Sequence, residues 1–105
     1  MAVAVTVVYP KTDASHFDYE YYAAKHIPLV HARWDGLGLV RAEFLRGVSQ
    51  VDGATADYAL LGTLVFDSTE AVHAALSAHG AEIMGDIPNY TNVQPFIQIN
   101  ELFGK

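Results

Sequence analysis

One histidine in this chain lies among aromatic residues at a spacing that suggests acid–base chemistry. His26 follows Tyr22 by four residues, and Tyr19 comes three residues earlier still. An imidazole titrates near neutral pH and can take or give a proton, and a neighbouring tyrosine can donate a hydrogen bond to an oxygen that gains negative charge. The alternative is a buried histidine whose hydrogen bond only satisfies the core.

A carboxylate much later in the chain is a candidate partner for this histidine. Asp86 opens the turn-rich segment 86–92, which also contains Tyr90 and Asn92. A carboxylate can orient an imidazole base, as the third group of a triad does. An aspartate can also cap its own turn, which is the commoner role. Tyr90 and Asn92 can offer donors to a ligand, although asparagine in such a turn more often bonds the backbone.

The other residues with catalytic side chains do not form a recognisable motif. The chain has no cysteine, and its remaining histidines are five or six residues apart rather than at the spacing of three or four that zinc sites on a helix use. Its serines lack a nucleophile-elbow context, and no glycine-rich phosphate loop occurs. We therefore expect no metal and no cofactor.

Composition and charge limit the class of protein. The 105 residues fit a single domain, 1–105, and their net charge is −6 with no cluster of Lys or Arg. Nucleic acid is therefore not an expected partner. No run approaches the roughly 18 apolar residues of a membrane span, and the N-terminus does not read as a signal peptide. A cytoplasmic protein without membrane contact is expected.

The residues around His26 are predicted to form an amphipathic helix. Successive helical residues turn by about 100°, so Tyr22, His26, Leu29 and Val30 share one stripe with Tyr19 at its edge. A helix that is apolar on two sides is usually covered on both.

The ends of this helix have sequence signals of their own. Ser15 with Asp18 three positions later resembles a capping box and predicts the start, and the helix runs towards Trp34. Pro28 removes a backbone donor and crowds the preceding turn, which predicts a kink or break near residues 26–27.

The rest of the chain alternates between strand and helix patterns. Asp67 and Glu70 predict the start of a second helix that stops at Gly80, with a short helical turn over 81–84. The order is β-α-β-β-α-β, which predicts an α+β, ferredoxin-like, four-stranded antiparallel sheet. Right-handed crossovers place both helices on one face of that sheet. The strands are expected at 2–9, 39–48, 58–66 and 93–102.

The opposite face of the sheet has no predicted cover. Strands 2–9 and 58–66 are apolar on both faces, so the open face would expose more apolar surface than the few hundred Å² that a soluble monomer tolerates. We therefore expect a homodimer in which the two sheets pack face to face.

The chain also resembles the EthD family, named for ethyl tert-butyl ether degradation. The resemblance covers essentially the whole chain, and its most specific part is the segment around His26. The matching segments are Tyr9-Pro10, Phe17-Asp18-x-x-Tyr21-Tyr22-x-x-x-His26-x-Pro28-Leu29, Leu64-Val65-Phe66-Asp67-Ser68, Asp86-Ile87-Pro88-Asn89-Tyr90-Thr91 and Pro95.

This resemblance implies a ferredoxin-like domain that dimerises into an α/β barrel. EthD proteins are associated with the breakdown of ethers and other small organic molecules. Related dimeric barrels include cofactor-independent monooxygenases, muconolactone isomerases and polyketide cyclases. Under this resemblance the matching positions are His26 and Tyr22, with Asp86 and Tyr90 as lining candidates. In an enzymatic interpretation His26 takes or gives a proton, Tyr22 steadies charge on oxygen, and Asp86 orients the imidazole.

Three functional hypotheses follow. The first is a protein that binds a small hydrophobic or aromatic compound and converts it without a cofactor, as an oxidoreductase, isomerase or cyclase. The second is a non-catalytic accessory or binding protein that supports a separate oxygenase. The third is a structural dimer with a filled core, which leaves no cavity of roughly 300 Å³ beside His26. The residues expected to bind substrate are Tyr19, Leu29, Trp34, Tyr90 and Asn92.

Overall fold

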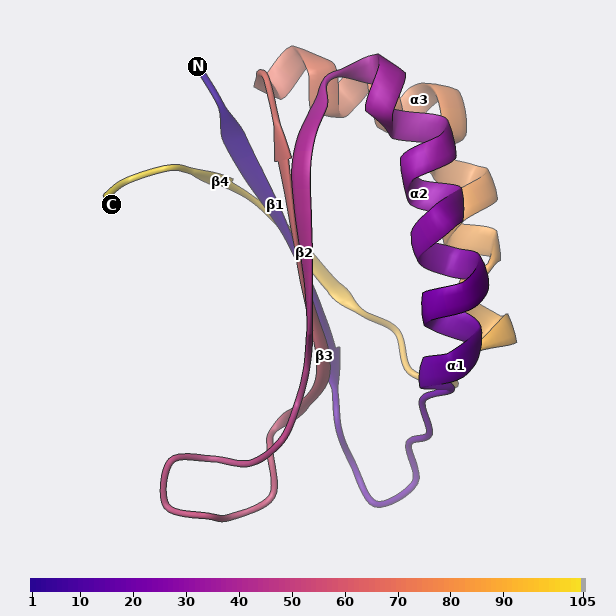
Figure 1. The fold of residues 1–105 in the computed structure, drawn as a ribbon, viewed down its shortest axis with the longest axis vertical. Helices are drawn as coiled ribbons and strands as arrows, with labels where there is room; N and C mark the ends of the chain where they lie inside the picture. The colour runs from indigo at the N-terminus through magenta and orange to yellow at the C-terminus, as the bar shows by residue number, and fades with distance from the viewer. Residues whose placement is uncertain (105) are drawn as a thin grey trace.

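The chain folds into a four-stranded antiparallel sheet with its helices on one face (Figure 1). The structure is a computed structural model that describes residues 1–104. The order of elements confirms the ferredoxin-like β-α-β-β-α-β arrangement. The elements are β1 (Val3–Pro10), α1 (Tyr19–Tyr21), a π-helical turn (Tyr22–His26), α2 (Ile27–Trp34), a 3-10 turn (Asp35–Leu37), β2 (Leu39–Arg46), β3 (Tyr58–Phe66), α3 (Thr69–Gly85), a 3-10 turn (Ile87–Asn89) and β4 (Phe96–Glu101).

The sheet has the strand order β2-β3-β1-β4, with β1 and β3 in its centre. Alternate residues of a strand point to opposite faces. Val3, Val5, Val7 and Tyr9 therefore share the face that the helices cover, and the first two and Tyr9 are buried. This alternation places the Tyr9 ring at the end of β1 beneath the first helix.

The first helix begins later than expected. Asp18 is its N-cap, and its carboxylate accepts a hydrogen bond of 3.0 Å from the Tyr21 amide. Ser15 instead closes a turn with Thr12, where its hydroxyl donates to the Thr12 carbonyl at 2.9 Å. The predicted start at Ser15 was wrong because Ser15 and Asp18 cap separate turns.

The proline in this helix is accommodated by a π-helical turn rather than a break. The Ile27 amide donates to the Tyr22 carbonyl five residues earlier, and the helix continues into α2 without interruption (Figure 1). Pro28 has no amide hydrogen and its ring crowds the carbonyl four residues before it. The break predicted near residues 26–27 is therefore absent, and the turn is widened by one residue instead.

The second helix is one continuous element, which corrects the predicted stop at Gly80. Its N-cap is Ser68 rather than Asp67, because the Ser68 hydroxyl accepts from the Ala71 amide at 3.1 Å. α3 passes through buried Gly80 to Gly85, so the separate turn predicted over 81–84 is part of it. A glycine inside a helix costs about 1 kcal/mol relative to alanine, which the packing of this helix offsets.

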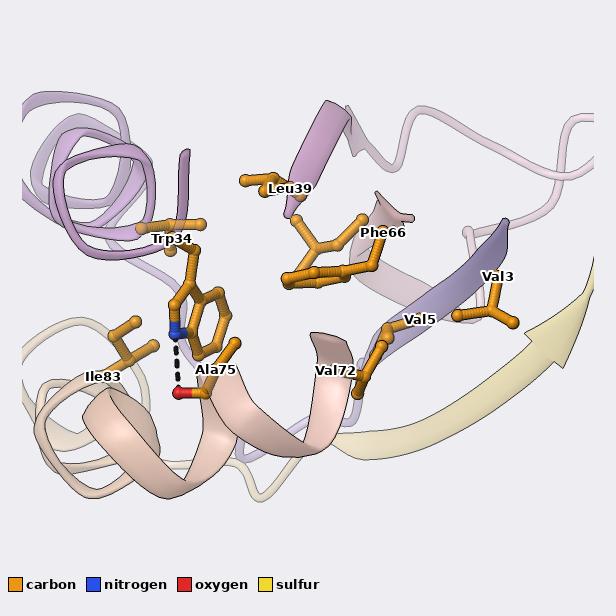
Figure 2. Packing of buried hydrophobic residues seen from close by; sticks show 10 residues of the cluster. Val3, Val5, Trp34, Leu39, Phe66, Val72, Ala75 and Ile83 are labelled. Carbon is orange, nitrogen blue, oxygen red and sulfur yellow. Dashed lines mark hydrogen bonds between the residues drawn. The ribbon is translucent and has the colours of Figure 1, made fainter. Parts of the chain in front are cut away.

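The core lies between the sheet and the helices (Figure 2). Trp34 packs against Phe66 with ring centroids 5.9 Å apart, and its indole N–H donates to the Ala75 carbonyl of α3 at 2.9 Å. Val72 and Ala75 are almost fully buried beside these rings. This hydrogen bond fixes α2 to α3 and satisfies the one polar atom of Trp34.

Three strand predictions needed correction at their ends, the first being β1, which runs over Val3–Pro10 rather than 2–9. β2 stops at Arg46, and a β-bulge between Leu39 and Arg41 leaves Val40 59% exposed rather than on the inner face with Ala42 and Phe44. The last strand starts at Phe96, three residues later than expected. β3 has the predicted bounds.

The outer face of the sheet is apolar in one row and polar in the next. Strand register aligns Leu45, Leu61, Val8 and Phe96 across all four strands, and Leu45 and Phe96 are 52% and 70% exposed. The neighbouring row contains threonine, glutamate and glutamine, so strands β1 and β3, expected to be apolar on both faces, have a polar pair on the outer face. The residues of this polar row are Glu43, Thr63, Thr6 and Gln98.

Within residues 1–104, none of the helices combines the length and the apolar character needed to cross a lipid bilayer.

Candidate functional site

A cleft opens between the sheet and the helix layer, and His26 lies in its wall. Its enclosed volume is about 50 Å³, below the roughly 300 Å³ of a ligand site, and the wider space around it is open to solvent. Its lining comes from all four strands and from α2 and α3, and is mostly aliphatic. In the described part of the chain, no Lys, Arg, Asp or Glu contributes to the lining. The side chains with polar atoms there are Tyr9, Tyr22, His26 and Trp34.

The cleft has an apolar rim. Met84 and Ile97, both cleft residues, are 37% and 41% exposed. Ile97 lies near the start of β4, one of the two edge strands (Figure 1). The exposed part of the cleft lining on α3 and β4 is therefore hydrophobic.

Asp86 contacts the imidazole of His26 at its Nδ1 atom. Its Oδ2 atom lies 2.9 Å from Nδ1 of His26, and the His26 side chain is only 6% exposed. Its Oδ1 atom accepts from the Tyr21 hydroxyl at 2.7 Å and from the Asn89 amide at 2.9 Å. The structure thus joins His26 and Asp86, 60 residues apart, as the sequence had suggested.

This contact sets the tautomer of His26. The pKa of Asp86 is held below its usual value: burial raises it, but the hydrogen bonds from Tyr21, Asn89 and His26 outweigh that effect. An ionised carboxylate only accepts hydrogen bonds, so Nδ1 of His26 carries the proton and Nε2 is the acceptor of the neutral ring.

The imidazole is nonetheless kept neutral by its surroundings. Burial lowers the pKa of His26 from its ordinary value, and the hydrogen bond and charge of Asp86 offset this only in part. A neutral imidazole whose Nε2 can accept a proton near pH 7 is in the protonation state that a general base requires.

Tyr22 stacks on His26 without a hydrogen bond. Their ring centroids are 5.0 Å apart at an interplanar angle of 23°. Among residues 1–104, the Tyr22 hydroxyl has no hydrogen-bond partner, although no fully buried side-chain polar atom is unpaired. Because Tyr22 lines the cleft, this hydroxyl can donate to a ligand. Burial raises its pKa, so it remains protonated.

The segment after α3 places a second tyrosine against His26. The Tyr90 hydroxyl lies 3.4 Å from Nε2 of His26 and 2.6 Å from the Tyr9 hydroxyl, and its residue is fully buried. The Asp18 amide donates to the Tyr90 carbonyl at 2.7 Å, and Thr91 donates to the His16 carbonyl. These bonds fix the segment to the start of the first helix.

Several predicted ligand residues lie elsewhere. The Tyr19 hydroxyl donates to the Ala59 carbonyl at 2.9 Å, and Leu29 packs on the core; neither lines the cleft. Asn92 bonds the backbone of residues 14 and 16 and is exposed. Trp34 does line the cleft, with its N–H already donated to Ala75.

Three members of the hydrogen-bond network were not among the predicted site residues. Tyr9 belongs to the cleft wall, and Tyr21 and Asn89 donate to Asp86. The alternation of β1 was a signal for Tyr9, since it put that ring on the same face as the buried valines. Tyr21 had no such signal, because only the path of α3 brings Asp86 to it.

Metal-ligating side chains do not gather in the described part of the chain. Among residues 1–104, no three His, Cys, Asp or Glu side chains are close enough to share an ion.

Comparison with solved structures gives similar proteins over nearly the whole chain. An EthD-like protein from Ralstonia eutropha JMP134 has 36% sequence identity and a TM-score of 0.89, with 99% of this chain and 94% of that chain covered. An ethyl tert-butyl ether degradation (EthD) family protein from Bacillus halodurans C-125 has 20% identity and a TM-score of 0.70, with 98% and 100% covered.

A cofactor-independent oxygenase shares the fold at lower identity. A variant of SnoaB from Streptomyces nogalater has 15% identity and a TM-score of 0.69, with 99% of this chain and 95% of that chain covered. No protein-family model matches the chain, and no curated protein matches it. Identity of about a third over full length, together with the shared fold, shows the family. The chain belongs to the EthD-like family.

Proposed function

We propose that this protein binds a small, uncharged hydrophobic compound in the cleft and converts it without a cofactor, with His26 as general acid or base. One observation carries the proposal: an apolar cleft has in its wall an imidazole whose Nδ1 is held by a carboxylate and whose Nε2 is an acceptor. The similarity in fold to a cofactor-independent oxygenase supports it.

The lining favours an uncharged ligand. An ion that enters a site without a countercharge loses its hydration and gains no partner, which costs several kcal/mol or more. The lining has no Lys, Arg, Asp or Glu among the described residues. A ring compound with one or two hydroxyl or carbonyl groups matches the polar atoms of Tyr9, Tyr22 and His26.

The three predicted catalytic side chains have distinct roles in this proposal. His26 accepts a proton from the bound compound, and Asp86 stabilises the imidazolium through the 2.9 Å contact at Nδ1. Tyr22 donates its unpaired hydroxyl to the oxygen on which negative charge develops. His26 can then return the proton to a different atom of the compound, which gives isomerase or cyclase chemistry. A monooxygenase reaction requires molecular oxygen as the second reactant.

We also propose that the protein is a homodimer joined through the outer faces of its sheets. The row Leu45, Leu61, Val8 and Phe96 supports this arrangement because it runs across all four strands and half or more of Leu45 and Phe96 is exposed. Pairing of two such rows would remove their side chains from water.

The test of catalysis uses wild type and His26→Gln on a panel of quinols, enol-lactones and polyketide-like phenols. Glutamine keeps hydrogen-bonding capacity but cannot take a proton at neutral pH. We expect turnover of at least one compound by wild type and a loss of about 10²–10⁴-fold in kcat for the variant. Binding of panel compounds is measured in parallel by calorimetry.

Each other outcome points to a different conclusion. Equal turnover by both proteins would show that His26 is not the acid or base. Binding without turnover across the panel would favour the non-catalytic accessory protein, for which the same cleft serves as a carrier site. Absence of binding to every compound would contradict the proposed function itself.

A further inference from the structure

Tyr9 is connected to His26 although the two side chains do not touch through their polar atoms. The Tyr9 and Tyr90 hydroxyl oxygens are 2.6 Å apart in a buried position, and the Tyr90 oxygen is 3.4 Å from Nε2 of His26. Tyr9 and His26 both line the cleft, whereas Tyr90 does not. Tyr90 therefore bridges two cleft-lining groups from behind the wall.

The carboxylate of Asp86 fixes the direction of the hydrogen bond that it makes with His26. Asp86 only accepts, so Nδ1 of His26 donates to it and Nε2 must accept. Either hydroxyl can donate in the Tyr9–Tyr90 contact; in the orientation that a relay uses, the Tyr90 hydroxyl donates to Nε2 and the Tyr9 hydroxyl donates to the Tyr90 oxygen. In that orientation all three donors point towards Asp86. The Tyr9 oxygen keeps a lone pair that is free to accept a hydrogen bond from a ligand.

We propose that Tyr9 is the ligand-facing end of a proton relay, Tyr9–Tyr90–His26, through which the imidazole withdraws a proton from a bound phenol or enol. This inference rests on the proposed function of the cleft and names the chemical class of its ligand: an uncharged, largely apolar compound with a weakly acidic O–H.

The transfer is balanced within the protein and the ligand. The ligand O–H bond breaks and its proton forms a new O–H bond with Tyr9. The former Tyr9 proton moves to Tyr90, and the former Tyr90 proton forms the Nε2–H bond of His26. The electron pair stays on the ligand oxygen, which then accepts a hydrogen bond from Tyr9. No oxidant or reductant takes part.

Burial requires the two hydroxyls to move their protons together. Burial raises the pKa of both Tyr9 and Tyr90. At Tyr90 the nearby Tyr9, Tyr22 and Asp86 raise the pKa as well. A phenolate is therefore unfavourable at either position, so each oxygen gives up one proton as it receives another. The charges that remain are the ligand anion and the imidazolium beside Asp86.

The experiment uses two probes that differ by one proton. Para-nitrophenol can ionise, and its absorbance reports the ionised fraction of the bound form; para-nitroanisole has the same ring without the acidic proton and reports binding alone. Wild type, Tyr90→Phe and Tyr9→Phe are compared at one fixed pH below the pKa of free para-nitrophenol. Tyr58→Phe is the matched control, because it removes a tyrosine hydroxyl from β3 outside the cleft.

We expect wild type and Tyr58→Phe to ionise the bound phenol, and nitrogen NMR to show His26 converted to imidazolium when it binds. Tyr90→Phe and Tyr9→Phe are expected to lower the ionisation equilibrium of the bound phenol about tenfold, or one pKa unit. Affinity for para-nitroanisole shows whether each variant still has its cleft.

Two results would overturn the relay. One is ionisation of the phenol to the wild-type extent in both relay variants. The other, which needs no variant, is a His26 ring that stays neutral in wild type while the bound phenol is ionised. Failure of para-nitroanisole to bind wild type would instead overturn the proposed function of the cleft, and the relay with it.

Discussion

At the scale of residues, the notable property of the site is an imidazole held neutral beside a carboxylate held ionised. Burial acts on both groups, and it disfavours the charged form of each. Asp86 resists because it accepts hydrogen bonds from Tyr21, Asn89 and His26, whereas His26 is compensated by Asp86 alone. Because Asp86 has three hydrogen-bond partners and His26 is compensated by one, Asp86 stays ionised while His26 stays neutral.

The neutral state of His26 predicts a dependence of stability on pH. Because burial lowers its pKa in the folded protein, the unfolded chain binds the proton more readily below about pH 6.5. The contribution of His26 is therefore fully present above that pH, and is lost as the pH falls towards the folded pKa. Asp86, with a lowered pKa, keeps its contribution until more acidic pH, below about 4.

The measurement is the free energy of unfolding in urea at pH 7 and pH 5.5, for wild type and His26→Gln. We expect wild type to lose more stability between these pH values than the variant, since the difference isolates His26 from the other titrating groups. An equal loss in both proteins would contradict the neutral, buried imidazole.

A second prediction concerns the acceptor capacity of Asp86. The carboxylate accepts from three donors, and in Asp86→Asn the amide has one acceptor oxygen and directs an NH₂ group at one of those donors. We expect a loss of about 1–3 kcal/mol in the free energy of unfolding. Asp35→Asn is the control, because Asp35 also contacts a histidine but its side chain is 60% exposed, and such surface pairs contribute about 0–1 kcal/mol. Equal losses would show that Asp86 has no special structural role.

At this scale the sequence supported the candidate pair but not the whole network. His26 was recognisable from its aromatic neighbours, and Asp86 from its turn. The links through Tyr9, Tyr21 and Tyr90 depend on three segments that meet only in the folded chain. Periodicity along one helix does not report such contacts.

At the scale of elements, the π-helical turn determines how the two halves of the first helix face the core. It contains one residue more than an α-helical turn, so that Tyr22 and His26 stack on one side while Val30 and Trp34 remain buried further along. Pro28 favours the π-helical turn locally. Because both ends of the helix are packed against the core, one half cannot rotate relative to the other to restore a regular α-helix.

The relative orientation of the two halves of the helix predicts which single-residue deletion the helix tolerates. In a Pro28→Ala background, deletion of exposed Ala24 removes the extra residue and leaves an α-helix with both ends in their native orientation. Deletion of exposed Ala32 in the same background turns Trp34 by about 100° away from Ala75. We expect the first protein to melt cooperatively and the second to lose its cooperative transition, as measured by circular dichroism. Similar melting of both proteins would show that the π turn does not set the phase.

The limits of the sequence are visible at the ends of the elements. Gly80 looked like a stop, but its position inside packed α3 outweighs a cost of about 1 kcal/mol. Val40 fitted an alternating strand, and a bulge turned it outward. Element types and their order follow from periodicity over many residues, while caps and bulges depend on single contacts with other parts of the chain.

At the scale of the whole molecule, the sheet has one covered and one open face, and the apolar row of the open face leads to the last prediction. Phe96→Glu and Leu45→Glu place a carboxylate on each side of that row. Because burial of an unpaired charge costs about 3 kcal/mol or more, we expect each variant to shift the proposed dimer towards monomer. Light scattering after size-exclusion chromatography at micromolar concentration measures the mass of each species.

Leu37→Glu is the control, because Leu37 is also exposed but lies in the turn between α2 and β2, away from the row. It is expected to keep the wild-type mass. A wild-type protein that elutes as a monomer would contradict the dimer, and a dimer unaffected by either row variant would place its interface elsewhere.

The absence of charged side chains from the cleft lining has a consequence for the rate at which ligands arrive. Charged clefts concentrate field lines and accelerate association in a manner that salt suppresses. Residues 1–104 contribute no Lys, Arg, Asp or Glu to this lining, so in a protein of net charge −6 an uncharged compound receives no such guidance. Its capture is then a partition from water into an apolar space, with an association rate that does not change between low and high ionic strength.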